Sequence, residues 1–318
     1  MQPGRSCPLH YRYLPSELAG DTPIAADTLY VVGGIYGNRP ALEALLALAD
    51  LERVEPTLAF NGDFNWFDID PAGFEIINNE VLCHAALRGN VETELSDEDA
   101  AAGCGCGYPG WVGDAEVERS NQIMASLRHT ARQFPGIRSR LAALPMHLAA
   151  EVGGMRIAIV HGDARSLAGW DYSRELIAGA AHRKRIAGDF DAAAARVIAS
   201  SHTCLPVMSE FDVTAGRAVL INNGAAGMPN FTNTRHGVIT RISTRPAAGR
   251  DVLYGTRIDH IHVDALALRY DHARWIAQFN ANWPDGSPGH ASYYCRIVQG
   301  PDMPSPARKK HAEEAPHG

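Results

Sequence analysis

Long apolar runs are missing from this sequence of 318 residues. A helix that crosses a membrane needs about 20 consecutive, mostly apolar residues, and no stretch approaches that length. The segment from Met1 to Gly20 also lacks the basic stretch followed by an apolar stretch that marks a secretory signal peptide. We therefore expect a cytoplasmic protein with no membrane partner.

Cysteines are few and irregularly spaced, which argues against a disulfide framework. The sequence has 6 of them, Cys7, Cys83, Cys104, Cys106, Cys204 and Cys295. In a reducing cytoplasm, their thiols would be free for metal binding or redox chemistry.

Basic clusters are also scarce, and the formal net charge is −7. The two short basic runs, 183–185 and 308–310, are typical of a solvated helix face and a polar tail. The sequence therefore predicts no nucleic-acid-binding patch, and no feature of it indicates an oligomeric state.

Short apolar runs alternate with segments of helical periodicity along most of the chain. The runs at 28–32, 57–60 and 156–160 are short and rich in aliphatic residues, which predicts buried strands. The segments 41–51 and 176–187 carry apolar residues at helical spacing. This alternation predicts a layered α/β fold.

The domain organisation follows from the same pattern. Residues 1–27 are predicted to form an N-terminal extension, and residues 28–300 a single domain. The acidic and Ala/Gly/Cys-rich stretch 93–115 interrupts the pattern and is predicted to be an insertion. Residues 301–318 carry proline, charge and little apolar content, which predicts a disordered tail.

Polar residues follow the apolar runs at five places. Taken alone, Asp63 or Asn90 is typical of a turn, and His161 or His202 of a hydrogen-bonded core histidine. Together they supply the carboxylate, amide and imidazole groups that divalent cations bind, each after a predicted strand. The five segments are Gly34-Ile35-Tyr36-Gly37-Asn38, Gly62-Asp63, Gly89-Asn90-Val91-Glu92, His161-Gly162 and Ser201-His202-Thr203-Cys204.

In this order, the segments resemble those of the calcineurin-like metallophosphoesterases, whose pattern is D-x-H, G-D, G-N-H-[DE], H-G and G-H-x-H. The resemblance covers roughly residues 28–242. It implies a four-layer sandwich of two facing mixed β-sheets flanked by helices. It also implies two divalent metal ions that share the Asp of G-D, and hydrolysis of a phosphate ester through a metal-bound hydroxide.

Carried over by position, one of the two ligand sets is complete. Asp63, Asn90, His161 and His202 match its ligands, so the resemblance implies one divalent ion (Mn, Fe, Zn or Ni), with a pair of ions as the alternative. Asp63 and His161 are also predicted to be catalytic.

The other ligand set has lost most of its members. Gly34 stands at the position of the Asp of D-x-H, and Tyr36 at the position of its His. Cys204 replaces the last His of G-H-x-H and is predicted to be a substitute metal ligand. Tyr36 is predicted to plug the emptied metal position, with a hydrogen bond to a substrate phosphate as the alternative.

Three further residues are candidates for roles in catalysis or substrate binding. Val91 replaces the histidine that serves the leaving group, so Glu92 is a candidate acid–base group, with a structural role as the alternative. Arg88 offers a fork of donors to a phosphate, or pairs with Glu92. Asn38 is predicted to lie near the metal centre, because the resemblance places it there.

Cys104 and Cys106 raise a separate hypothesis. If the insertion folds over the strand ends, these thiols and Cys204 rebuild a softer metal site beside Asp63. A reversible disulfide between Cys104 and Cys106, and a purely structural role as small loop residues, are the alternatives.

The sequence thus predicts a divergent metal-dependent phosphoesterase, a phosphatase acting on a small phosphorylated molecule with one retained metal-binding half-site. The alternative is a catalytically inactive module on the same fold that binds a phosphorylated ligand or a protein. A third hypothesis is redox chemistry at Cys104 and Cys106.

Overall fold

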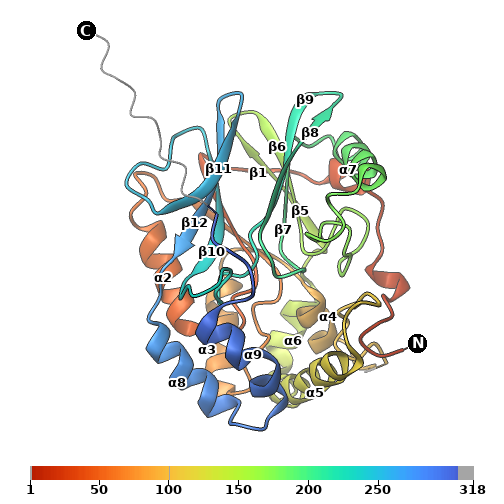
Figure 1. Ribbon diagram of the computed structural model, residues 1–318, viewed down its shortest axis with the longest axis vertical. Helices are drawn as coiled ribbons and strands as arrows, with labels where there is room; N and C mark the ends of the chain where they lie inside the picture. The colour runs from red at the N-terminus through yellow and green to blue at the C-terminus, as the bar shows by residue number, and fades with distance from the viewer. Residues whose placement is uncertain (1, 100, 307–318) are drawn as a thin grey trace.

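Two six-stranded mixed sheets form the centre of the computed structural model, which describes residues 2–99 and 101–306. The strand order is β1-β5-β6-β7-β9-β8 in the first sheet and β11-β12-β10-β2-β3-β4 in the second (Figure 1). The strands are β1 (Ile24–Ala25), β2 (Thr28–Val32), β3 (Thr57–Asn61), β4 (Ala85–Leu87), β5 (His147–Val152), β6 (Met155–Val160), β7 (Val197–Ser200), β8 (Val207–Val213), β9 (Gly216–Asn222), β10 (Gly237–Ser243), β11 (Val252–Ile258) and β12 (Ile261–Leu268).

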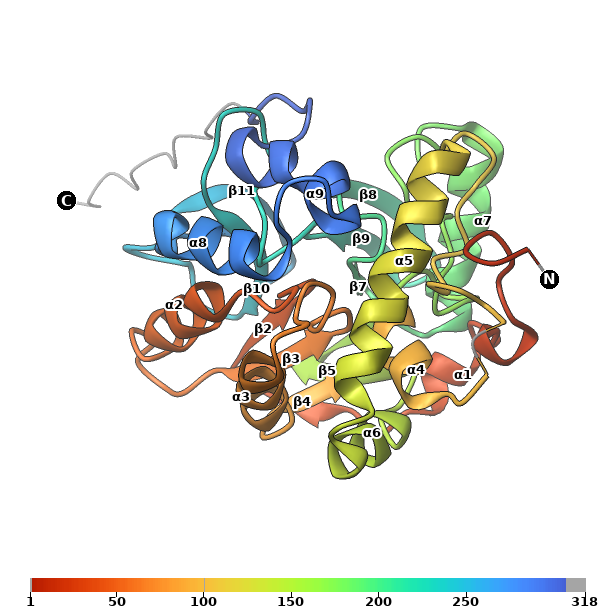
Figure 2. The same cartoon turned by 90° about the horizontal axis from the view of Figure 1, so that it is seen from below.

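Helices cover the outer faces of the sheets and one end of the molecule (Figures 1 and 2). Helices α2, α3 and α8 share an apolar cluster with the second sheet, and α7 shares one with the first. No described helix is long and apolar enough to cross a membrane. The helices are α1 (Glu17–Gly20), α2 (Arg39–Ala49), α3 (Pro71–Val81), α4 (Asn90–Ser96), α5 (Asp114–Ala131), α6 (Pro135–Ala142), α7 (Ala180–Ala192), α8 (His272–Asn282) and α9 (Pro288–Gln299), preceded by a short 3-10 helix, η1 (Leu9–Tyr11).

Strand β2 shows how the sequence builds these layers. All of its residues are buried, and successive side chains point to opposite faces because the side-chain period of a strand is two. Leu29 and Val31 join the apolar cluster between the two sheets, whereas Tyr30 and Val32 join the cluster under the helices. A strand covered on both faces has no solvent-exposed side, which is why the run 28–32 lacks the alternation of apolar and polar residues that a half-exposed strand shows.

The helix starts are fixed by capping residues. The side chain of Asn38 accepts a hydrogen bond from Ala41 N at the start of α2, and Pro40 occupies the first turn. Asp70, Asp271 and Ser287 cap α3, α8 and α9 in the same way.

The predicted fold class, two facing mixed sheets flanked by helices, is confirmed. Some predicted boundaries differ from the structure. The start of the expected insertion 93–115 lies in α4 and its end in α5, so the described irregular residues between these helices are 97–99 and 101–113. The helix expected over 176–187 begins only at Ala180.

The segments that flank the predicted domain take part in the fold where the structure describes them. Within the N-terminal extension, β1 pairs in parallel with β5, which adds a strand to the first sheet. Of the expected tail 301–318, residues 301–306 are described, and the rest, with its basic run 308–310, lies outside the described residues. The single-domain boundaries stay a prediction.

Candidate metal centre

Four loops meet at the carboxyl ends of parallel strands from both sheets. Asp63 follows β3 and Asn90 follows β4 in the second sheet, whereas His161 follows β6 and His202 follows β7 in the first. Residues that directly follow parallel strands gather at one edge of each sheet, and here the two edges are neighbours. Segments that lie far apart in the sequence therefore share one site.

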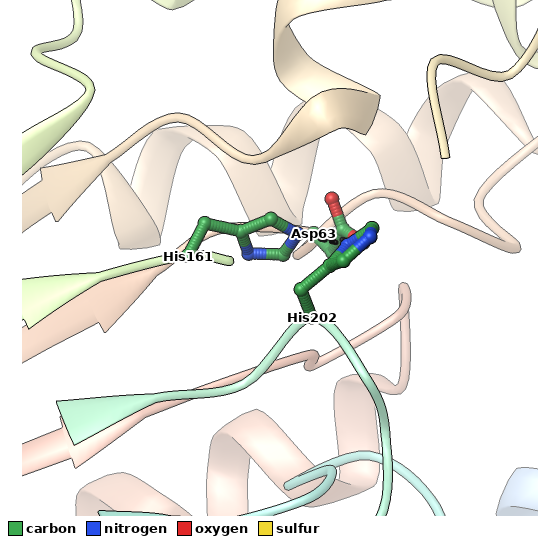
Figure 3. A group of neighbouring side chains, drawn as sticks. All are labelled: Asp63, His161 and His202. Atoms are coloured by element: carbon green, nitrogen blue, oxygen red, sulfur yellow. Dashed lines mark hydrogen bonds and ion pairs between the residues drawn. The ribbon is translucent and has the colours of Figure 1, made fainter. Parts of the chain in front are cut away.

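The polar ends of these side chains converge. The Nε2 atom of His161 lies 3.3 Å from Asp63 Oδ2, 3.2 Å from Asn90 Oδ1 and 3.1 Å from His202 Nδ1. Ligand atoms of Asp63, His161 and His202 all lie within 4.8 Å of one another, and the three residues are buried. Figure 3 shows these three side chains pointing toward one another.

Hydrogen bonds on the side away from the centre determine which atom of each candidate ligand presents a lone pair to the centre. His161 Nδ1 lies 2.7 Å from the carbonyl oxygen of Asn61, and His202 Nε2 lies 3.0 Å from that of Cys106. A carbonyl only accepts, so each of these ring nitrogens donates its hydrogen outward and leaves the lone pair of the other nitrogen facing inward. Asn90 Nδ2 likewise donates to Cys104 O at 2.9 Å, so Asn90 Oδ1 faces the centre.

When both rings are neutral, the centre is therefore a group of acceptors with no hydrogen between them. Two imidazole nitrogens, an amide oxygen and a carboxylate oxygen repel one another at these distances unless a positive charge lies among them. A borderline divalent cation such as Zn, Mn, Fe or Ni binds this mixture of nitrogen and oxygen donors. The donor set fits the predicted metal.

The pKa shifts agree with a demand for positive charge at the centre. Burial disfavours the charged ring of His161, but the Asp63 carboxylate outweighs burial, and the pKa of His161 is raised. Burial and the neighbouring His161 lower the pKa of His202 to about 3, so this ring is neutral. Burial alone would raise the pKa of Asp63, yet the two imidazoles lower it. Asp63 is thus ionised and is a candidate anionic ligand.

Glu92 lies beneath the metal ligands and is fully buried. Its carboxylate accepts hydrogen bonds from Asp63 N at 2.7 Å and Gly89 N at 3.0 Å, and also from Phe64 N and Asn65 Nδ2. Burial and the charge of Asp63 raise the pKa of Glu92 to about 7. These contacts hold the loops that carry Asp63 and Asn90, and they favour the structural alternative for Glu92 over an acid–base role.

The altered half of the centre is filled by its own side chains. The backbone of Gly34 has φ of +52°, and a Cβ atom placed there would lie 2.4 Å from Cζ of Tyr36. The Tyr36 hydroxyl lies 2.9 Å from Cys204 Sγ. The phenol therefore occupies the space that a side chain at position 34 would need, which is the arrangement expected of a plug.

Cys204 lines the same cavity but does not belong to the group of candidate ligands found among the described residues. Its sulfur lies 3.2 Å from His202 O as well as near the Tyr36 hydroxyl. Burial raises the pKa values of both Cys204 and Tyr36. The sulfur thus faces the Tyr36 hydroxyl and the His202 carbonyl, and the predicted role of Cys204 as a metal ligand stays a prediction.

Cys104 and Cys106 are joined in a disulfide, which corrects the expectation of free thiols for this pair. The loop that carries them does fold over the strand ends, because its carbonyls accept hydrogen bonds from Asn90 and His202. Paired sulfurs are not thiolate ligands, so the structure presents the disulfide alternative and not the rebuilt site.

Two of the predicted substrate-binding residues lie away from the metal centre. Asn38 caps α2 and donates a second hydrogen bond from Nδ2 to Gly227 O at 2.8 Å. Arg88 Nη1 lies 3.3 Å from Ala142 O. Neither residue lines the cavity beside the ligands, whereas Tyr36 does. Their predicted roles in substrate binding stay predictions.

A cavity of about 300 Å³ opens beside Asp63, Asn90 and His202. Much of its remaining wall comes from the loop between α4 and α5, which one sequence hypothesis placed over the strand ends, and from the loop after β6 and helix α9, which sequence reasoning did not place at the site. The side chains that these segments add include Tyr108, Trp170, Tyr293 and Arg296. Ser287 and Pro288 are a sequence signal for the start of α9, but no signal shows where that helix docks.

Comparison with known proteins identifies the fold. No protein-family model and no curated protein matches the sequence. The chain is similar to the crystal structure of a metallophosphoesterase from Sphaerobacter thermophilus, at 19% sequence identity and a TM-score of 0.55, covering 87% of this chain and 100% of that one. It is also similar to a hypothetical protein from Pyrococcus horikoshii OT3, at 15% identity and a TM-score of 0.58, covering 88% and 100%. The predicted metallophosphoesterase fold is thereby confirmed.

Proposed function

We propose that this chain is a metal-dependent phosphoesterase that holds one divalent ion in its retained half-site and hydrolyses a small phosphorylated molecule in the cytoplasm. The observation that carries the proposal is the convergence of four acceptor groups, Asp63 Oδ2, Asn90 Oδ1, His161 Nε2 and His202 Nδ1. The likeness in fold to the metallophosphoesterase from Sphaerobacter thermophilus supports the same reading.

The chain's own residues hold the ligands rigidly in place. The Asn61 carbonyl fixes the ring of His161, and the Cys106 carbonyl fixes that of His202. Val91 N donates to Asp63 Oδ1 at 3.1 Å, which orients the other oxygen toward the centre. When bound, a divalent ion polarises a phosphoryl oxygen and makes a water molecule more acidic.

A buried side chain replaces the family's proton donor to the leaving group. Val91 is fully buried and has no group that can protonate an oxygen. The leaving group must therefore depart without a proton from this position or take one from water. Slow turnover of esters with basic leaving groups follows from this arrangement.

The runner-up function is a module that binds a phosphorylated ligand without hydrolysing it. The Tyr36 plug over Gly34 and the loss of the proton donor at Val91 favour this reading, because both remove parts of the catalytic apparatus. The two functions share the metal and differ in turnover.

Metal content and turnover distinguish them. The purified chain should bind a divalent ion by elemental analysis and hydrolyse a nitrophenyl phosphate when supplied with Mn, Zn, Ni or Fe. His161→Ala should lose both properties, whereas His129→Ala, an exposed position on α5, should keep both. A chain that binds metal but turns over no ester in a broad panel is the binding module, and a chain that binds no metal refutes both.

A further inference from the structure

Arg296 lies in the cavity wall on the side of the altered half-site. It extends from α9, and its Nη2 atom donates a hydrogen bond to Cys204 O at 2.5 Å. Its Nε atom is buried and has no hydrogen-bond partner. Among the described residues that line the cavity, it is the only arginine or lysine.

No carboxylate neutralises this guanidinium within the part of the chain that the structure describes. Glu116 lines the same cavity, but it pairs with Arg119 at 2.6 Å. The guanidinium of Arg296 lies against the plug, because its Nη2 atom donates a hydrogen bond to the carbonyl oxygen of Cys204. A positive charge therefore stands next to the residue that replaces the missing metal ligand.

Aromatic rings make up much of the rest of the cavity wall. The ring of Trp170 lies 5.9 Å from that of Tyr108 and 5.3 Å from that of His202, and the rings of Trp66 and Tyr293 are 6.3 Å apart. Trp111, which is 54% exposed, lies outside the lining of the cavity, with its ring 6.4 Å from that of Trp170. Such walls favour flat aromatic groups, which stack or meet the rings edge to face.

We propose that this cavity binds the phosphate monoester of an aromatic alcohol, with Arg296 gripping the phosphoryl oxygens in place of the missing second cation. This proposal rests on the proposed function and specifies its substrate. A guanidinium presents planar paired donors that match phosphate, and it needs no ligand set of its own. The volume of about 300 Å³ suits one small ester and excludes a folded macromolecule.

The missing proton donor points to the same substrate class. In the hydrolysis, a water oxygen forms a bond to phosphorus and its extra proton passes to the product phosphate or to solvent. The ester P–O bond breaks, its electron pair stays on the leaving oxygen, and the released phenolate takes up a proton from solvent after it departs. A phenol has a pKa of about 10 and is far more acidic than an aliphatic alcohol, so its anion leaves without prior protonation. With valine at position 91, we therefore expect hydrolysis of an aryl ester to proceed and hydrolysis of an alkyl ester to be much slower.

Binding of inert phosphonates to the metal-loaded chain tests the proposal without relying on turnover. Phenylphosphonate should bind at least tenfold more tightly than methylphosphonate by isothermal titration. Arg296→Met should weaken phenylphosphonate binding at least tenfold with metal content unchanged, and Arg296→Lys should fall between. Arg274→Met removes an exposed arginine of the neighbouring helix α8, paired with Glu43, and should change neither property.

The outcomes separate the two proposals. Equal affinity for the two phosphonates overturns the aromatic site, and an Arg296→Met chain that is folded by circular dichroism but binds phenylphosphonate like the parent overturns the role of Arg296. If Arg296→Met unfolds the chain, Arg296→Lys is the test. Unchanged phenylphosphonate affinity in Arg296→Lys counts against the role of the paired guanidinium donors, and a tenfold loss of affinity supports it. Loss of metal from the parent chain is instead a failure of the proposed function.

Discussion

The retained half and the altered half of the centre lie side by side, and they differ in whether their polar groups satisfy one another. In the retained half, four acceptor groups converge and only a positive charge relieves their repulsion. In the altered half, the Tyr36 hydroxyl and the Cys204 thiol satisfy each other at 2.9 Å and cover Gly34. One half presents a donor set suited to a positive charge, and the other is satisfied by its own side chains.

The difference shows how side chains fill the position where the resemblance would place a second metal ion. Removing ligands one at a time would leave buried polar groups or an empty space, and each of these destabilises a protein. Here Gly34, Tyr36 and Cys204 depend on one another. The Tyr36 phenol fits only because position 34 has no side chain, and its hydroxyl is paired with the Cys204 thiol. Arg296 then supplies positive charge on that side.

The strongest test of the retained half removes a ligand. Asp63→Asn takes away the charge that attracts the ion, so metal affinity should fall more than about 100-fold, because removing even a group that only supports a ligand typically lowers affinity 10–100-fold. Equilibrium titration with Zn²⁺ in a chelator buffer measures the change. Asp68→Asn, at a buried aspartate that is not a ligand, is the matched control, and equal losses in both would contradict the assignment.

The strongest test of the altered half puts a side chain back at position 34. Gly34→Asp should lower the free energy of unfolding by about 2–4 kcal/mol, since the new side chain collides with Tyr36 and the backbone is left-handed there. Adding Tyr36→His should recover part of that loss. Urea denaturation of the single and double variants measures both, and a single variant as stable as the parent would disprove the plug.

The pH dependence of metal binding should report the raised pKa of His161. A protonated His161 has no lone pair at Nε2, so binding must release that proton. As the pH falls through this raised pKa, affinity should drop by about tenfold per pH unit, and it should level off above it. Titrations from about pH 5.5 to 8.5 test the sign, and affinity that rises on acidification would contradict it.

The smallest expected effect concerns the disulfide. The loop it closes braces Asn90 and His202 through the carbonyls of Cys104 and Cys106. Cys104→Ser/Cys106→Ser should weaken metal binding by about two- to tenfold, less than loss of a ligand, because the ligands remain. Cys83→Ser, an exposed free cysteine, is the control. Metal affinity that is insensitive to both the double variant and a dithiol reductant would show that the loop is not a brace.

The sequence predicted the residues of the retained half far better than the strands and helices that surround them. Asp63, Asn90, His161 and His202 each follow a short apolar run, so strand periodicity and the resemblance together predict that they meet. The strands at 147–152, 207–213 and 261–268 and the two C-terminal helices were not predicted, since their patterns mix polar and apolar residues. Arg296 was missed for this reason.

The local sequence pattern also did not predict the tertiary contacts that the loop residues make. The side chain of Asn38, which stands where a helix cap is expected from local sequence, also donates a hydrogen bond to Gly227 O, a partner far away in sequence that no local pattern indicates. The left-handed backbone at Tyr36, Asp63 and Cys204, where φ is 56°, 55° and 58°, likewise reflects tertiary packing rather than residue type. The predicted plug is an exception, because a bulky ring in place of a ligand suggested it directly.

Anomalous scattering from crystals grown with Mn²⁺ tests the central claim most directly. The account predicts one manganese peak per chain, among Asp63, Asn90, His161 and His202, and none beside Gly34 and Tyr36. A second peak beside Tyr36, or no peak among the four ligands, would contradict it.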